Sequence, residues 1–209
     1  MVTRWETLAD DASRKGTLLH MYCERVLNAA PDDLPLDTTE FVDIAKEVAQ
    51  HTSFMSSDFI TRFSLCPYAT ELLVWYTVNN EIVSAGQVDA LMRSRETGAF
   101  FLIDWKRVSS KRKLTADEAS FQDRFGFGHC SDIPDTHFHK YSLQCSIYAI
   151  MLMHSHGFDV GDRLFLVRMR VDRDSYEVVQ CCDWRPVAQS LLQMEYTRLI
   201  AKRRNVQVV

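Results

Sequence analysis

The sequence predicts a mixed α/β fold in which helices flank a central β-sheet. Helical and extended hydrophobic patterns follow one another along the chain, and 46% of its 209 residues are hydrophobic, which is enough for a substantial core. At this length we expect a single domain over residues 1–209. It is expected to divide into a helical part (1–69), a core of strands and one helix (70–183), and a C-terminal helix (184–209).

The first third of the chain has the spacing of amphipathic helices. Apolar residues recur at helical intervals over residues 13–28, and prolines and aspartates follow directly and end the pattern. A second helix is expected over residues 40–50 and a third over residues 54–65. The N-terminal part is therefore predicted to be entirely helical.

The pattern becomes extended at Glu71. Strand-forming residues dominate up to Val78, the pair Asn79-Asn80 predicts a tight turn, and the extended pattern resumes over residues 82–92. A third strand is expected over residues 100–108. We expect these three segments to form an antiparallel meander.

The last part of the chain alternates between loop, helix and strand. Residues 111–134 are polar and lack a clear period, which predicts a loop or a short helix crossing the sheet. A helix is expected over residues 139–156, followed by a hairpin of residues 164–171 and 176–182. A final helix begins at Pro186, a residue that the first helical turn accepts.

Two aspartates and a lysine are predicted to meet on the meander. Asp89 lies on its second strand, and Asp104 lies two residues before Lys106 on its third. If these strands are antiparallel neighbours, the two carboxylates converge at one end of the sheet and Lys106 points from the same face as Asp104. Clustered carboxylates repel one another unless a cation lies between them, and hard oxygen ligands favour Mg²⁺ or Mn²⁺. A nearby ammonium can orient a water or offset charge on a phosphorane, so the pattern predicts metal-assisted phosphodiester hydrolysis.

Five short motifs occur in a fixed order between residues 16 and 148. They are Gly16-Thr17-Leu18-Leu19-His20, Glu71, Gly86-Gln87-Val88-Asp89, Asp104-Trp105-Lys106 and Gln144-Cys145-Ser146-Ile147-Tyr148. In this order the chain resembles the RecB-like branch of the PD-(D/E)XK nucleases, which includes mitochondrial genome maintenance exonucleases. The resemblance implies a restriction-endonuclease-like core. A proline often precedes the first catalytic acid in that family, and here Val88 takes its place.

The resemblance also implies a role for each motif. The implied ligands of one or two Mg²⁺ or Mn²⁺ ions are Asp89, Asp104, the backbone carbonyl of Trp105, His20 and, with a strand cap as the alternative, Glu71. Lys106 would be the catalytic lysine. Gln144 and Tyr148 share a helix face and would support the site and contact DNA. Considered singly, His20 is more often a structural histidine, and Gln144 and Tyr148 are ordinary polar positions on a helix surface.

A basic run follows the third strand. Arg107, Lys111, Arg112 and Lys113 are well placed to bind a phosphate backbone, although a solvated loop explains them equally well. The net charge is −4, so affinity for a nucleic acid has to come from such a local cluster or from a bound cation.

Composition and targeting signals limit the remaining possibilities. The six cysteines are too sparse and too irregularly spaced for a disulfide framework, and they do not supply the ligand set of an iron–sulfur cluster. No apolar run approaches the length of a membrane span, and the N-terminus lacks a signal-peptide core. We therefore expect an intracellular protein without membrane contact, in the nucleus, mitochondrion or cytoplasm.

The sequence as a whole predicts a Mg²⁺- or Mn²⁺-dependent DNA nuclease, as the resemblance implies. An exonuclease acting on single-stranded DNA or duplex ends is the first interpretation, and a place in a larger replication or repair protein is compatible with it. The alternatives are a structure-specific DNA endonuclease, an RNA endonuclease of the cap-snatching type and a non-catalytic nucleic-acid-binding module.

Overall fold

The computed structural model describes residues 4–30, 37–108 and 124–206. Its elements, in chain order, are α1 (Arg4–Asn28), η2 (Thr39–Ile44), α2 (Ala45–Met55), α3 (Asp58–Arg62), β1 (Leu65–Val78), β2 (Glu81–Ser94), β3 (Phe100–Val108), η4 (Gly128–Cys130), α4 (His137–His156), β4 (Leu164–Arg170), β5 (Tyr176–Gln180) and α5 (Arg185–Val206).

The described strands form one five-stranded mixed sheet in the order β1-β2-β3-β4-β5. β3 and β4 are parallel, and the other neighbouring pairs are antiparallel. Because parallel neighbours need a long crossover, α4 lies between β3 and β4 in the chain. This is the restriction-endonuclease-like α/β arrangement that the sequence predicts, with its meander of three strands and its later hairpin.

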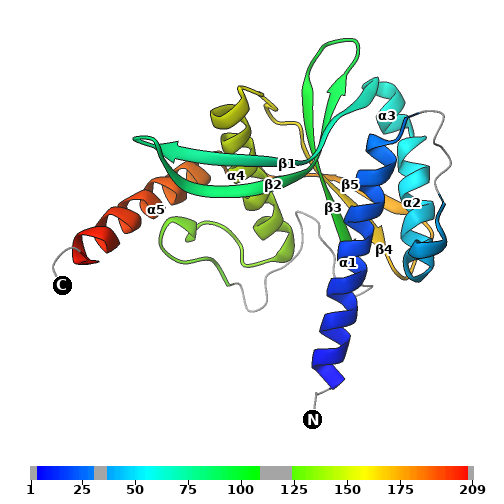
Figure 1. Cartoon of the computed structure of the whole chain (residues 1–209), viewed down its shortest axis with the longest axis horizontal. Coiled ribbons are helices and arrows are strands. Elements are labelled where there is room, and N and C mark those ends of the chain that lie inside the picture. The colour runs from blue at the N-terminus through cyan, green and yellow to red at the C-terminus, as the bar shows by residue number, and fades with distance from the viewer. Residues whose placement is uncertain (1–3, 31–36, 109–123, 207–209) are drawn as a thin grey trace.

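Helices cover both faces of the sheet and bury a separate apolar cluster on each. Helices α1 and α2 pack on one face around Trp105, and α4 and α5 pack on the other around Leu102 and Leu166. Figure 1 shows α1, α2 and α3 at one side of the molecule and α4 and α5 at the other. β3 therefore carries side chains into two different cores, and both sides of its backbone are fixed.

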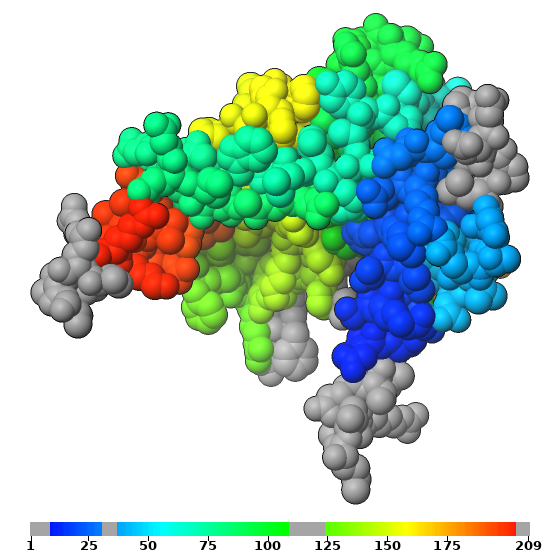
Figure 2. Space-filling view, in the orientation of Figure 1, coloured from blue at the N-terminus to red at the C-terminus, as the bar shows by residue number. Residues whose placement is uncertain are grey.

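Strands β1 and β2 form a long hairpin. Its turn residues Asn79 and Asn80 both have positive φ, 51° and 64°, which a tight hairpin turn requires and asparagine tolerates. On the face shown in Figure 2, the hairpin forms a band that extends from α1 to α5. The predicted turn is confirmed.

The third predicted helix is wrong in part. Helix α2 ends at Met55, the short α3 follows, and β1 begins at Leu65, six residues before the expected start of the first strand. Ser57 caps α3 by accepting a hydrogen bond from the Ile60 amide, and the chain then turns at Ser64, whose φ is 49°. Pro67 hides the strand in the sequence, but β1 is an edge strand, where proline is tolerated, and a register irregularity follows Pro67.

Two other helices begin earlier than the sequence predicts. Helix α1 begins at Arg4, nine residues before the expected start, and α4 begins at His137, because the Thr136 side chain accepts a hydrogen bond from the His139 amide at 3.2 Å. Within the described ranges, no helix combines the length and the hydropathy that crossing a membrane would require.

Candidate active site

Three acidic residues lie side by side on β1, β2 and β3. The β2–β3 pairing ends with Ala90 opposite Ile103, so Asp89 and Asp104 are the next residues of these two strands. On the other side of β2, the residues that flank Glu71 pair with the residues that flank Asp89. Facing positions of antiparallel strands carry neighbouring side chains, and the three carboxyl groups therefore gather where β2 separates from β3.

Helix α1 adds His20 to this row. The His20 Nδ1 atom lies 3.4 Å from Asp89 Oδ1 and 3.7 Å from Glu71 Oε1. Burial alone would lower the pKa of His20, but the carboxylates of Asp89 and Glu71 outweigh it and raise this pKa to about 10. The imidazole is therefore a cation at neutral pH, and it offsets the negative charge of the two carboxylates.

Asp104 and Lys106 form a buried ion pair on the same face of β3. Lys106 Nζ lies 2.6 Å from Asp104 Oδ2, and the Asp104 side chain is 2% exposed. Burial and the nearby charge of Asp89 raise the pKa of Asp104 to about 6, although Lys106 acts in the opposite direction. Burial works against the charge of Lys106, but Asp104 and Asp89 more than compensate and raise the pKa of its ammonium.

The Asp89 carboxylate is anchored by the backbone of β3. Its Oδ2 accepts a hydrogen bond from the Trp105 amide at 2.8 Å, which leaves Oδ1 directed toward His20. The Trp105 indole is buried on the other face of the strand, against the rings of His51 and Phe54. Packing of this indole in the core thus fixes the backbone amide that orients a carboxylate of the candidate site.

Glu71 has an unusual backbone conformation. Its φ is 46°, in the left-handed region that residues with a side chain rarely adopt. The Gln87 side chain donates a hydrogen bond from Nε2 to the Glu71 carbonyl at 3.0 Å. Gln87, at one of the two unspecified positions of the Gly86-Gln87-Val88-Asp89 motif, therefore supports the backbone conformation that places the Glu71 carboxylate beside His20. Sequence reasoning missed this role of Gln87, because the motif leaves its position unspecified.

Two motifs that are far apart in the sequence meet at Gly86. A Cβ atom on Gly86 would lie 2.6 Å from Cε1 of Tyr148, so only glycine lets the tyrosine ring lie this close to β2. The Tyr148 hydroxyl accepts a hydrogen bond from Gln144 Nε2 at 3.0 Å. The structure therefore brings Gln144 and Tyr148 of α4 to the strand that carries Asp89. Around Gly16, in contrast, no other described segment of the chain comes within 4 Å of the place its Cβ would take.

Helix α4 contributes one more residue that the sequence did not single out. The Lys106 ammonium lies 4.6 Å from the ring centroid of Tyr141. Tyr141 precedes Gln144 by three residues and Tyr148 by seven, so the three share one helix face. This spacing was the available signal, but it did not distinguish Tyr141 from the other aromatic residues of the helix.

The basic run does not join this cluster within the described residues. Arg107 lies on the opposite face of β3 from Lys106, and its Nε donates to the buried Glu47 carboxylate of α2 at 2.6 Å. Lys111, Arg112 and Lys113 lie outside the described residues. A DNA contact by any of the four stays a prediction.

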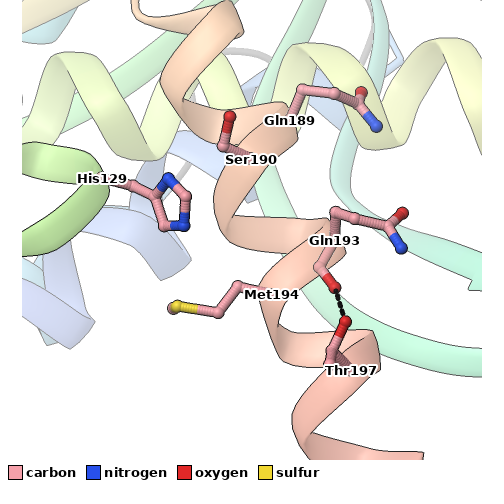
Figure 3. Close-up of a pocket in the computed structure, with 6 residues that line it drawn as sticks. All are labelled: His129, Gln189, Ser190, Gln193, Met194 and Thr197. Carbon is pink, nitrogen blue, oxygen red and sulfur yellow. Dashed lines mark hydrogen bonds between the residues drawn. The ribbon is translucent and has the colours of Figure 1, made fainter.

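One surface pocket lies away from these charged groups. It measures about 530 Å³ and lies between α5 and the segment that carries His129. Figure 3 shows the residues that line it: His129, Gln189, Ser190, Gln193, Met194 and Thr197. None of these residues belongs to the acidic cluster. Charged groups that converge are better evidence for chemistry than the volume of an open pocket, and we therefore place the candidate active site at the cluster.

The cluster offers donor atoms of the kind that bind divalent metal ions. One ligand atom each from His20, Glu71 and Asp89 lie within 4.8 Å of one another. Carboxylate oxygens with one imidazole nitrogen suit hard or borderline cations such as Mg²⁺ and Mn²⁺. Asp104, the next carboxylate in the row, is close enough for the charge of Asp89 to raise its pKa. The residues present therefore fit a metal ion.

The five-stranded mixed sheet with its flanking helices is consistent with a restriction-endonuclease-like α/β fold. Comparison with solved structures finds matches of low sequence identity. One is a candidate exonuclease from Eubacterium rectale, with 12% sequence identity and a TM-score of 0.48 over 91% of this chain and 66% of that one. Another is the protein SSO0001, with 15% identity and a TM-score of 0.36 over 90% of this chain and 86% of that one. The present chain thus spans slightly less than two thirds of the Eubacterium protein. No protein-family model and no curated protein matches the sequence. Similarity at this level says nothing about activity, which has to be inferred from the chain's own residues.

Proposed function

We propose that this protein is a metal-dependent nuclease that hydrolyses phosphodiester bonds in DNA, as an exonuclease on single strands or duplex ends. One observation carries the proposal. Glu71 and Asp89, on the adjacent strands β1 and β2, converge with His20 of α1 beside the buried Asp104–Lys106 pair of β3. Ionisable groups that converge and shift one another's pKa values are typical of functional sites. The sequence motifs and their order support the same assignment.

The ligand set follows from the cluster. His20, Glu71, Asp89 and Asp104, with the backbone carbonyl of Trp105, would hold one or two Mg²⁺ or Mn²⁺ ions. When bound, the metal would lower the pKa of a water and polarise the phosphate. His20 carries a proton next to Asp89 and Glu71, and it would have to lose that proton before its nitrogen could act as a ligand.

The remaining residues orient the reacting groups. Lys106 extends from the face of β3 that carries Asp104, and its ammonium would hold the attacking water or a phosphate oxygen. The Trp105 amide keeps the Asp89 carboxylate in one orientation. Gln144 and Tyr148 are hydrogen-bonded to each other, and they would support the site from α4 and contact the nucleic acid.

The decisive experiment offers several substrates to the wild-type chain. End-labelled single-stranded DNA, duplex DNA, single-stranded RNA and closed circular DNA are each incubated with Mn²⁺ or with EDTA. We expect shortening of the linear DNA from its ends with Mn²⁺ and none with EDTA. Cleavage of circular DNA would indicate an endonuclease, and exclusive cleavage of RNA would indicate an RNA endonuclease, a candidate favoured by the histidine among the acids. Binding without metal-dependent cleavage of any substrate would identify a non-catalytic module and refute the proposal.

Two variants connect the activity to the cluster. Lys106→Met is expected to lower turnover by about 100-fold or more, the usual effect of losing a group that takes part in general acid–base catalysis. Asp89→Asn is expected to remove metal-dependent turnover. Lys46→Met is a matched control, because Lys46 lies on α2 with a half-exposed side chain near Asp174 and outside the cluster. Turnover near the wild-type value in Lys106→Met would remove this lysine from the mechanism.

A further inference from the structure

The Lys106 ammonium has two partners of different kinds. On one side is the Asp104 carboxylate at 2.6 Å, and on another is the ring of Tyr141, whose centroid lies 4.6 Å away. The Lys106 side chain is 16% exposed, so the ring covers a cation that is already largely shielded from water. Under these conditions the attraction between a cation and an aromatic face is stronger than at an open surface.

The two partners affect the ammonium differently. A carboxylate accepts an N–H hydrogen bond, whereas an aromatic face attracts the charge without occupying a particular N–H group. An ammonium has three N–H groups, so the ring can hold it in place and still leave donors for a water or a phosphate oxygen. A lysine side chain has four flexible carbons, and the backbone of β3 fixes only the end at Cα. The position of the ammonium therefore depends on its other contacts.

The Tyr141 ring has an aromatic neighbour on its own helix. The His137 ring lies 6.3 Å from it between centroids, with 28° between the two planes. Both residues lie in the first turns of α4, directly after the Thr136 cap that fixes the start of the helix. The ring is thus presented to Lys106 from a defined point on a regular element.

We propose that Tyr141 is a positioning residue whose aromatic face holds the Lys106 ammonium at the candidate site. This inference rests on the proposed nuclease function and adds a residue that none of the sequence motifs contains. Tyr141 acts through Lys106 and has no part in the chemistry of its own. The phenol ring carries the role, and the hydroxyl group does not.

The test compares three variants under the conditions that give wild-type turnover. Tyr141→Leu is expected to lower kcat about tenfold with KM unchanged, a size that matches a shielded cation–aromatic contact. Tyr141→Phe keeps the ring and is expected to retain kcat within about twofold of wild type. Tyr196→Leu is the matched control, since Tyr196 is a half-buried tyrosine on α5 whose hydroxyl accepts a hydrogen bond from Asn79.

Three kinetic results would overturn the inference. Equal losses in Tyr141→Leu and Tyr141→Phe would assign the role to the hydroxyl. A rise in KM without a change in kcat would make Tyr141 a substrate contact, and an unchanged Tyr141→Leu would leave the ring without a role. The free energy of unfolding of each variant is measured in parallel, and a loss of kcat in Tyr141→Leu that follows a loss of folded protein would count against the proposal.

A second readout does not depend on activity. Protons held over an aromatic face resonate upfield, so the Hε signal of Lys106 in protein labelled with ¹³C at lysine Cε is expected upfield of the other lysines. Its assignment comes from its absence in Lys106→Arg. The shift should persist in Tyr141→Phe and disappear in Tyr141→Leu, and a Lys106 signal without it would refute the contact. If the wild type cleaves no substrate, the proposed function fails and with it the kinetic role of Tyr141, whereas the NMR result separately decides whether the contact exists.

Discussion

His51 is a fully buried histidine on α2, packed edge to face against the rings of Tyr22 and Trp105. Neither ring nitrogen has a hydrogen-bond partner in the part of the chain that the structure describes. Burial lowers the pKa of His51 to about 4, so the folded protein keeps this imidazole neutral at pH values where the unfolded chain already binds a proton.

A pH dependence of stability follows for this residue. Between pH 6.5 and about 4 the unfolded state carries the extra proton, so the free energy of unfolding falls as the pH is lowered. At pH 5 we expect His51 to account for a loss of about 2 kcal/mol relative to pH 7. Denaturant unfolding of wild type and His51→Phe at both pH values measures it. Identical pH dependence in the two proteins would show that His51 does not titrate in this way.

Gly86 allows a second prediction, because its lack of a side chain leaves room for the Tyr148 ring. Gly86→Ala is expected to displace that ring, to lower turnover, and to destabilise the fold by about 1–3 kcal/mol through overpacking. In a Tyr148→Ala background the same change should be neutral or slightly stabilising, because the obstacle is gone and alanine orders a strand better than glycine. Equal destabilisation in both backgrounds would disprove the proposed packing relation.

At the scale of elements, Gln50 joins α2 to the end of β4. Its Oε1 accepts a hydrogen bond from the Arg170 amide at 2.8 Å, and its Nε2 donates to the carbonyls of Arg170 and Arg173 at 2.8 and 2.9 Å. The side chain is fully buried. It therefore satisfies backbone groups where the strand ends.

Removing these hydrogen bonds should weaken the attachment of α2. Gln50→Leu keeps a similar volume but leaves buried backbone groups unpaired, and we expect the free energy of unfolding to fall by about 2–4 kcal/mol. Chemical denaturation is the measurement, with Gln193→Leu on the exposed face of α5 as the control. A Gln50→Leu protein as stable as the control would mean that other groups replace the amide.

The order of elements could be predicted because hydrophobic periodicity changes clearly from helical to extended near Glu71. The start of β1 could not. Residues 65–70 contain Pro67, which is acceptable because β1 lies at the sheet edge and its register is irregular after this residue. The pattern near Ser64 also continued a helical period that the Ser57 cap and the turn interrupt in the fold. The start of such a strand depends on its pairing with the neighbouring strand. The local sequence carries no information about that pairing.

Part of the candidate site, too, could be predicted from the sequence, and part of it could not. The meeting of Asp104 and Lys106 follows from the alternation of side chains along one strand, and their proximity to Asp89 follows from antiparallel pairing with the neighbouring strand. The contributions of Gln87 and Tyr141 depend on contacts between elements that are distant in the chain. No periodicity within one element reveals such contacts.

At the scale of the whole molecule, the metal ligands proposed here come from separate elements. His20 lies on α1, Glu71 on β1 and Asp89 on β2. An ion held by all three would connect the N-terminal helix to the sheet, and binding to the folded state alone stabilises that state. The metal should therefore affect global unfolding as well as turnover.

Thermal unfolding tests this linkage without any substrate. At a Mn²⁺ concentration 100 times its dissociation constant we expect about 2.7 kcal/mol of added stability, a rise in Tm of about 5–10 °C for a chain of this size. Asp89→Asn should abolish the rise, while Asp162→Asn, at a largely exposed surface position, should keep it. A rise of equal size in Asp89→Asn would show that Mn²⁺ binds elsewhere.

The left-handed backbone of Glu71 implies a compromise between the stability of the fold and the proposed binding of a metal ion. A residue with a side chain pays about 1–3 kcal/mol for that conformation, and glycine would relieve most of it. We expect Glu71→Gly to unfold at a higher denaturant concentration than wild type and yet to respond more weakly to Mn²⁺, whereas a variant that unfolds more easily would contradict this view. If stability were the only requirement, glycine would be the better residue at this position. On this view, Glu71 lowers the free energy of unfolding but keeps a carboxylate beside His20.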